Sequence, residues 1–269
     1  MFGVPLLIFI LQPLGADNQI WDAIGLGGIK SYGEAYSKYK EATPMFFPIK
    51  IHSKSRKTNF RKEKSMSTTQ TTSKLSAKAL REEVRKEYAN VALDPHKGYH
   101  FHTGRAAADR LGYDPSIYAD VPEENIASFA GTGNPFMLGP INPGEIVVDI
   151  GSGSGFDSLI ASTLVGPEGK VIGVDMTQEM LNKAQAGAES MGATHVAFRE
   201  GFAENLPLLE EYADVVISNG VLNLTLDKVK TLNEWARILK PGGRLYIGDI
   251  LVAKSIPPEA LDDISLWTG

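Results

Sequence analysis

The chain has 269 residues, of which 43% are hydrophobic, and a formal net charge of −5. This length is enough for one large core or two small ones. The chain has no cysteine, which excludes disulfides, zinc–thiolate sites and thiol catalysis. Because this composition fits a reducing compartment, we expect a cytoplasmic protein.

The charge is unevenly distributed. Residues 1–65 carry 10 Lys/Arg against 5 Asp/Glu, whereas residues 66–269 carry 17 against 27. An acidic main part disfavours contact with nucleic-acid backbones, so no nucleic-acid partner is expected. The basic run at 50–64 is interpreted as a solvated linker, with contact to nucleic acid or anionic lipid as the alternative.

Residues 1–65 differ in character from the rest of the chain. The apolar stretch at 2–14 is interrupted by Pro5 and Pro13, is too short to span a bilayer, and lacks the positive region of a secretory signal. No stable membrane insertion is therefore expected. Met66 precedes a polar Ser/Thr run, so we interpret residues 1–65 as an atypical extension and Met66 as an alternative or true start.

Residues 66–140 are expected to form a helical segment, with a helix over about 77–91. Titratable side chains then gather at 98–105 (Gly-Tyr-His-Phe-His-Thr-Gly-Arg). His100 and His102 would share one face of a strand, but no Asp, Glu or Cys completes a ligand set with His96, so no metal is expected. Ordinary structural histidines remain the alternative to a catalytic role.

Residues 146–157 (Ile-Val-Val-Asp-Ile-Gly-Ser-Gly-Ser-Gly-Phe-Asp) predict a buried strand, a tight loop and the start of a helix. Glycines at 151, 153 and 155 allow positive φ and close approach of a ligand. Helix N–H groups point at such a ligand. A second strand ends at Asp175, where a carboxylate can accept hydrogen bonds from both ribose hydroxyls. This pattern indicates a nucleotide-like ligand.

Strands expected at 171–174 and within 195–207, 213–224 and 239–251, the second and third of these stretches including the loop after the strand, alternate with helical stretches at 155–165, 177–191 and 227–239. This alternation predicts an α/β fold with a doubly wound, mostly parallel sheet. Its ligand would bind outside the carboxyl ends of the strands.

The glycine spacing is G-x-G-x-G, and Phe156 stands where a dinucleotide fingerprint has its third glycine. A dinucleotide-dependent oxidoreductase is therefore the disfavoured alternative. The pattern resembles motif I of class I S-adenosylmethionine (SAM)-dependent methyltransferases, which implies SAM as cofactor. The cofactor site implied by this resemblance consists of Asp149, Gly151, Ser152, Gly153, Gly155, Asp175, Met176, Phe202, Ala203 and Asn219.

Three further stretches resemble the arsenite methyltransferase family: 128–135 (Ser-Phe-Ala-Gly-Thr-Gly-Asn-Pro), 173–177 (Gly-Val-Asp-Met-Thr) and 217–224 (Ile-Ser-Asn-Gly-Val-Leu-Asn-Leu). That family binds trivalent arsenic through cysteine thiolates, and two of those positions match Thr132 and Gly220 here. Because soft arsenic requires sulfur ligands, we expect a small-molecule acceptor other than arsenite. Its reacting atom is left open.

The resemblance places catalytic candidates before the first strand and after the fourth. His102 or Tyr99 could act as a base, and Asn219 could lie near the methyl group. Asn223 is expected to be a turn residue and Asp249 a residue of the pocket rim.

The methyltransferase domain is expected over 141–269, with the C-terminal strands of this fold apparently missing. Either the sequence is a fragment, which we favour, or its fifth strand is an exposed edge. A SAM-binding protein without turnover remains a further alternative, and the oligomeric state is left open.

Overall fold

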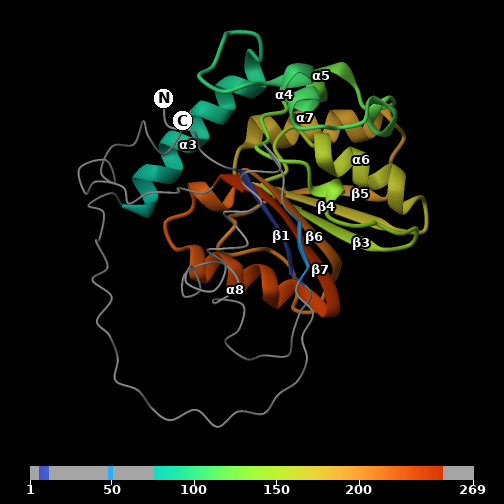
Figure 1. The fold of residues 1–269 in the computed structure, drawn as a ribbon. Coiled ribbons are helices and arrows are strands. Elements are labelled where there is room, and N and C mark those ends of the chain that lie inside the picture. The colour runs from blue at the N-terminus through green and yellow to red at the C-terminus, as the bar shows by residue number, and fades with distance from the viewer. Residues whose placement is uncertain (1–5, 12–47, 51–75, 251–269) are drawn as a thin grey trace, which may run out of the picture.

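The computed structural model describes residues 6–11, 48–50 and 76–250, the first two ranges as backbone only. Seven strands form one sheet in the order β2-β1-β7-β6-β3-β4-β5 (Figure 1). Five of them are parallel: β3 (Ile146–Ile150), β4 (Lys170–Asp175), β5 (Val196–Glu200), β6 (Ala213–Asn219) and β7 (Leu239–Ile250). The helices between them are α6 (Phe156–Val165), α7 (Gln178–Ser190) and α8 (Lys228–Ile238). The predicted doubly wound α/β fold is confirmed.

Both faces of the sheet are buried, as expected when helices cover a parallel sheet on two sides. Successive residues of a strand point to opposite faces. Val147 accordingly packs into the cluster that contains Leu159 of α6, and Val148 packs into the cluster that contains Trp235 of α8. Figure 1 shows α6 and α7 on one side of the sheet and α8 on the other.

A helical segment precedes β3. Its first element, α3 (Ala77–Leu93), begins at Ser76, whose hydroxyl accepts a hydrogen bond from the backbone N–H of Ala79. Val91 of α3 packs with Met180 of α7, so α3 is fixed beside the carboxyl ends of the strands. Shorter elements follow: α4 (Gly104–Arg110), η1 (Pro115–Tyr118), α5 (Glu123–Ala127) and η2 (Pro135–Met137). The helix predicted near 77–91 is confirmed.

The outer edge of β7 is paired. Strand β1 (Leu6–Leu11) runs antiparallel to it, from Leu6 opposite Ile250 to Leu11 opposite Leu245. Strand β2 (Pro48–Lys50) adds in parallel to β1. The alternative of an exposed fifth strand is therefore wrong, because the backbone of β1 supplies the hydrogen-bonding partners of that edge.

Residues 1–5, 12–47, 51–75 and 251–269 lie outside the described residues. The predicted start at Met66 and nearly all of the basic run fall there. Within the described part of the chain, no helix is long and apolar enough to cross a membrane.

Candidate functional site

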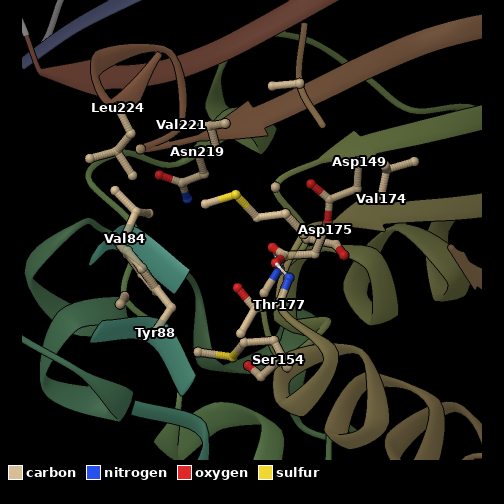
Figure 2. Close-up of a pocket in the computed structure, with 18 of the residues that line it drawn as sticks. Val84, Tyr88, Asp149, Ser154, Val174, Asp175, Thr177, Asn219, Val221 and Leu224 are labelled. Carbon is tan, nitrogen blue, oxygen red and sulfur yellow. Dashed lines mark hydrogen bonds between the residues drawn. The ribbon is translucent and has the colours of Figure 1, made fainter. Parts of the chain in front are cut away.

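A cavity lies between α3 and the carboxyl ends of β3, β4 and β6 (Figure 2). Its location follows from the topology, because the strand order reverses between β3 and β6 and the loops there part. Nine of the ten residues predicted for the cofactor line it, and Gly155 does not. Those nine are Asp149, Gly151, Ser152, Gly153, Asp175, Met176, Phe202, Ala203 and Asn219.

The glycine loop, residues 151–155, requires glycine at two positions, where positive φ and a close contact coincide. Gly151 has φ +72°, and a Cβ atom there would lie 2.1 Å from Cγ2 of Val221. Gly155 has φ +86° and caps α6, and a Cβ atom there would lie 2.9 Å from Cβ of Ala184. Gly151 therefore lets the loop after β6 close on the cavity, while Gly155 packs behind it.

Asp175 is held by the loops on either side of it. Its Oδ2 accepts a hydrogen bond from the N–H of Gly153 at 2.9 Å, and its Oδ1 accepts one from the N–H of Thr177 at 2.8 Å. Burial raises the pKa of Asp175, and these two bonds act in the opposite direction. Each carboxylate oxygen keeps a further lone pair that can accept a ligand hydroxyl.

Asn219 is bonded on both ends of its amide. Its Oδ1 accepts hydrogen bonds from the N–H groups of Thr132 and Gly133 at 2.8 and 2.9 Å. Its Nδ2 lies within 3.0 Å of the Gly133 carbonyl, Asp157 Oδ2 and the Tyr113 hydroxyl. The amide predicted to face the methyl group thus ties the 131–134 loop to β6, which is a positioning role.

Asp157, in the first turn of α6, was missed at the level of sequence. Its Oδ1 accepts a hydrogen bond from the Tyr113 hydroxyl at 2.7 Å. Burial raises the pKa of Asp157 to about 6. Burial and the neighbouring Asp157 carboxylate together raise the pKa of Asp149 well above its ordinary value. The available signal was an acid at a helix N-terminus directly after the glycine loop.

The two predicted bases do not line the cavity. The Tyr99 hydroxyl donates to the carbonyl of Asp94 at 2.8 Å, and its ring stacks on Phe101 at 5.4 Å. His102 is exposed, with Nε2 at 2.6 Å from Nη1 of Arg110. Their part as a base therefore stays a prediction, which the lining of the cavity does not support.

The α3 helix supplies the opposite wall of the cavity. Val84 and Tyr88 point into the cavity and face Leu224 (Figure 2). Nearer the start of α3, the Arg81 guanidinium lies 4.8 Å from the centre of the Phe202 ring and 3.3 Å from Oε1 of Glu204. Arg81 therefore links α3 to the loop after β5. The cavity has a glycine-rich acidic half and an apolar half.

Asp249 is buried and does not line the cavity, so the predicted rim position is wrong. Its Oδ2 accepts a hydrogen bond from the N–H of Leu222 at 2.7 Å, and it also accepts from the N–H of Asn223. Burial raises the pKa of Asp249 to about 6. Asn223 lies in η3 (Leu222–Leu224), as expected for a turn residue, and does not line the cavity. Asp249 orders the loop that carries the lining residue Leu224.

The cavity suits a ligand that offers both hydrogen bonds and positive charge. Ser152 Oγ is buried in its wall without a hydrogen-bond partner, and buried polar atoms normally have one. Carboxylates surround the same loop. In the described part of the chain, no group of three or more His, Cys, Asp or Glu side chains is placed to hold a metal ion.

Thr132 and Gly220 are neighbours. A Cβ atom built on Gly220 would lie 3.2 Å from Oγ1 of Thr132, and Gly220 lines the cavity. The two positions that match arsenic-binding cysteines in the resemblance are thus adjacent in space. In this chain, Thr132 offers a hydroxyl group in place of one thiol, and Gly220 has no side chain in place of the other.

Comparison with known proteins agrees with this geometry. Residues 141–267 match the methyltransferase domain family. The chain is 41% identical over 167 residues to an arsenite methyltransferase of Halobacterium salinarum, covering 62% of this chain and 42% of that protein. It is 37% identical over 106 residues to a ubiquinone/menaquinone biosynthesis C-methyltransferase of Vibrio campbellii, covering 39% of this chain and 41% of that protein.

Among solved structures, the chain is similar to an arsenic(III) S-adenosylmethionine methyltransferase from Chlamydomonas reinhardtii. That comparison has 37% identity and a TM-score of 0.50, and it covers 54% of this chain and 51% of the other. The chain spans about two fifths of the length of the two curated relatives above.

Proposed function

We propose that this chain, which matches the methyltransferase domain family over residues 141–267 and is similar to arsenite methyltransferases, transfers a methyl group from SAM to a small-molecule acceptor. The observation that supports this most is that the glycine loop, Asp175 and the residues at 202–203 share one cavity at the carboxyl ends of the strands. When bound, SAM supplies a methyl group already attached to its sulfonium leaving group. The protein then has to align two reactants and exclude water.

We propose that each part of the cavity holds one part of the cofactor. The glycine loop takes the methionine end, and the Asp175 carboxylate takes the ribose hydroxyls. Phe202 and Ala203 take the adenine side. This last assignment is supported by the Ala203 carbonyl, which accepts a hydrogen bond from Nε1 of Trp235 at 3.0 Å and so fixes the loop.

The acceptor is proposed to be an organic molecule rather than arsenite. Adjacent Thr132 and Gly220 offer no thiolate, and As(III) is a soft ion that needs one. The relative from Vibrio is a C-methyltransferase by name, which supports an acceptor atom other than arsenic. A general base is needed only if that atom must lose a proton. His102 and Tyr99 stay predictions for this role, as does a cytoplasmic location.

The first test is calorimetric titration of SAM and S-adenosylhomocysteine into the full chain. We expect micromolar binding that becomes at least about tenfold weaker in Asp175→Asn, because an amide offers one oxygen acceptor where the carboxylate offers two. Asp114→Asn is the matched control, since Asp114 is an exposed carboxylate that caps η1. A folded protein that binds neither ligand would contradict the proposal, and binding of a nicotinamide dinucleotide instead would favour an oxidoreductase.

The second test measures transfer of a radiolabelled methyl group to a metabolite pool and, separately, to arsenite with a thiol. Label in an organic product supports the proposal. Label in arsenic would overturn the acceptor assignment, and SAM binding without any transfer would favour a binding protein without turnover.

A further inference from the structure

The apolar half of the cavity lies between α3 and the loop after β6. It is formed by Val84 and Tyr88 of α3 and by Val221 and Leu224 of that loop, all of which line the cavity (Figure 2). The parts of the cavity proposed above to hold the cofactor lie on other elements. The apolar half is therefore left for the molecule that receives the methyl group.

The charged side chains of the cavity lie outside its apolar half. In the described part of the chain, the charged residues that line the cavity are Asp149, Asp157, Asp175, Arg81 and Glu204. The three aspartates belong to β3, α6 and β4, on either side of the glycine loop. The Arg81 guanidinium is paired with Glu204 at 3.3 Å and is directed toward the loop after β5. A charged acceptor in the apolar half would lose its hydration without gaining an ion pair there, which is costly.

Polar groups that border the apolar half already have partners. Thr225 Oγ1 donates a hydrogen bond to the Leu222 carbonyl at 2.9 Å, and Thr132 Oγ1 donates one to the Gly248 carbonyl at 3.3 Å. The Tyr88 hydroxyl differs from them, because it makes no hydrogen bond to any residue that the structure describes. A ligand in this half therefore meets an apolar surface on which the Tyr88 hydroxyl is free to hydrogen-bond.

We propose that the apolar half binds the methyl acceptor, and that this acceptor is a neutral, mostly apolar molecule with an oxygen or nitrogen atom that hydrogen-bonds to the Tyr88 hydroxyl. The inference rests on the proposed function and names a substrate class for it. Contact with Val84, Val221 and Leu224 removes apolar surface of the acceptor from water. The hydrogen bond to Tyr88 fixes its orientation, as single polar groups do in small-molecule sites.

The test compares probes that share a naphthalene ring and differ in charge at neutral pH: 2-naphthol is neutral, 2-naphthoate is anionic and 2-naphthylmethylamine is cationic. Each probe is titrated calorimetrically into the full chain saturated with S-adenosylhomocysteine. The titration is repeated with sinefungin, whose amine supplies the positive charge that the SAM sulfonium would carry. In both complexes we expect 2-naphthol to bind at least about tenfold more tightly than either charged probe, because a buried ion without a partner is costly.

Leu224→Asp places a charge in the apolar half. It should weaken 2-naphthol binding at least about tenfold and change the affinity for S-adenosylhomocysteine less than about twofold. Val229→Asp is the matched control, because Val229 is 44% exposed on α8 and does not line the cavity, and it should change neither affinity.

Tyr88→Phe tests the hydrogen bond separately. It should weaken the binding of 2-naphthol by about three- to tenfold, which is the range for one neutral hydrogen bond. Naphthalene, which has no hydroxyl, should bind this variant and the wild type equally. An equal change for both probes would mean that Tyr88 serves only as part of the apolar wall, and would overturn the assigned hydrogen bond.

Other outcomes decide the substrate class. A charged probe that binds as tightly as 2-naphthol in either complex would overturn it, as would an unchanged 2-naphthol affinity in Leu224→Asp. If Leu224→Asp does not fold, Leu224→Asn decides in the same way, because it removes apolar surface without adding a charge. Binding of S-adenosylhomocysteine without binding of 2-naphthol overturns this inference alone. A folded wild type that binds neither S-adenosylhomocysteine nor sinefungin contradicts the proposed function itself.

Discussion

At the scale of single residues, Asn219 combines a place in the cavity wall with a structural task. We predict that Asn219→Ala lowers the free energy of unfolding by about 2–4 kcal/mol, because it leaves the N–H groups of Thr132 and Gly133 without an acceptor. Urea unfolding monitored by circular dichroism measures this. The control is Asn223→Ala, since the Asn223 side-chain oxygen is buried without a hydrogen bond. The free energy of unfolding of Asn223→Ala should fall by less than about 1 kcal/mol. Equal losses of unfolding free energy in the two variants would contradict the prediction.

At the scale of elements, the loop between β3 and α6 is limited by its contact with the loop after β6. We predict that Gly151→Ala abolishes measurable SAM binding and lowers the melting temperature, because its methyl group would overlap Val221. Gly144→Ala is the matched control: Gly144 also has positive φ, at +83°, but a Cβ atom there meets nothing within 4 Å. That variant should show only the backbone cost of about 1 kcal/mol and retain SAM binding. Similar behaviour of the two variants would mean that φ, rather than the contact, requires glycine.

The pairing of β1 with β7 gives a second prediction for an element. Removing residues 1–65 deletes the strand that pairs with the edge of β7 over six residues. We expect the remaining chain to self-associate with rising concentration, because unpaired strand edges recruit other strands. Light scattering after size exclusion, with the full chain as control, measures this. A monodisperse monomer of unchanged melting temperature would instead agree with the prediction that Met66 is the true start, which intact-mass analysis of the native protein tests directly.

At the scale of the whole molecule, buried acids determine how stability depends on pH. Asp157 and Asp249 have pKa values raised by burial to about 6, above the ordinary value near 4 in an unfolded chain. Their favourable contribution to the free energy of unfolding is fully present below about pH 4 and is lost as the pH rises through 6. Three ion-paired acids, whose pKa values lie below the ordinary value, act in the opposite direction and lose their contribution below about pH 4: Glu145, Asp214 and Glu234.

We therefore predict a higher melting temperature at pH 5 than at pH 7.5, with a decline below about pH 4. Thermal unfolding across this range measures it, and Asp249→Asn should reduce the difference between pH 5 and 7.5. A melting temperature that is highest at pH 7.5 would contradict the prediction.

The sequence by itself determined the parts of this protein that are local. The strand, glycine loop and helix start around Asp149 are contiguous in the chain, and the strand that ends at Asp175 follows at a fixed spacing, so alternation and glycine positions were sufficient to predict them. The sheet class followed because parallel strands need helical crossovers.

Only the tertiary structure decided which distant groups meet. Asp157 is joined to Tyr113, 44 residues away, and to Asn219, 62 residues away, and no local pattern encodes such a network. Clustered polar groups predict Tyr99 and His102 as bases, but only the fold showed that the Tyr99 hydroxyl contacts the Asp94 carbonyl and that His102 contacts Arg110. Side-chain direction depends on how helices pack against the sheet, and that packing arises from contacts between segments far apart in the chain.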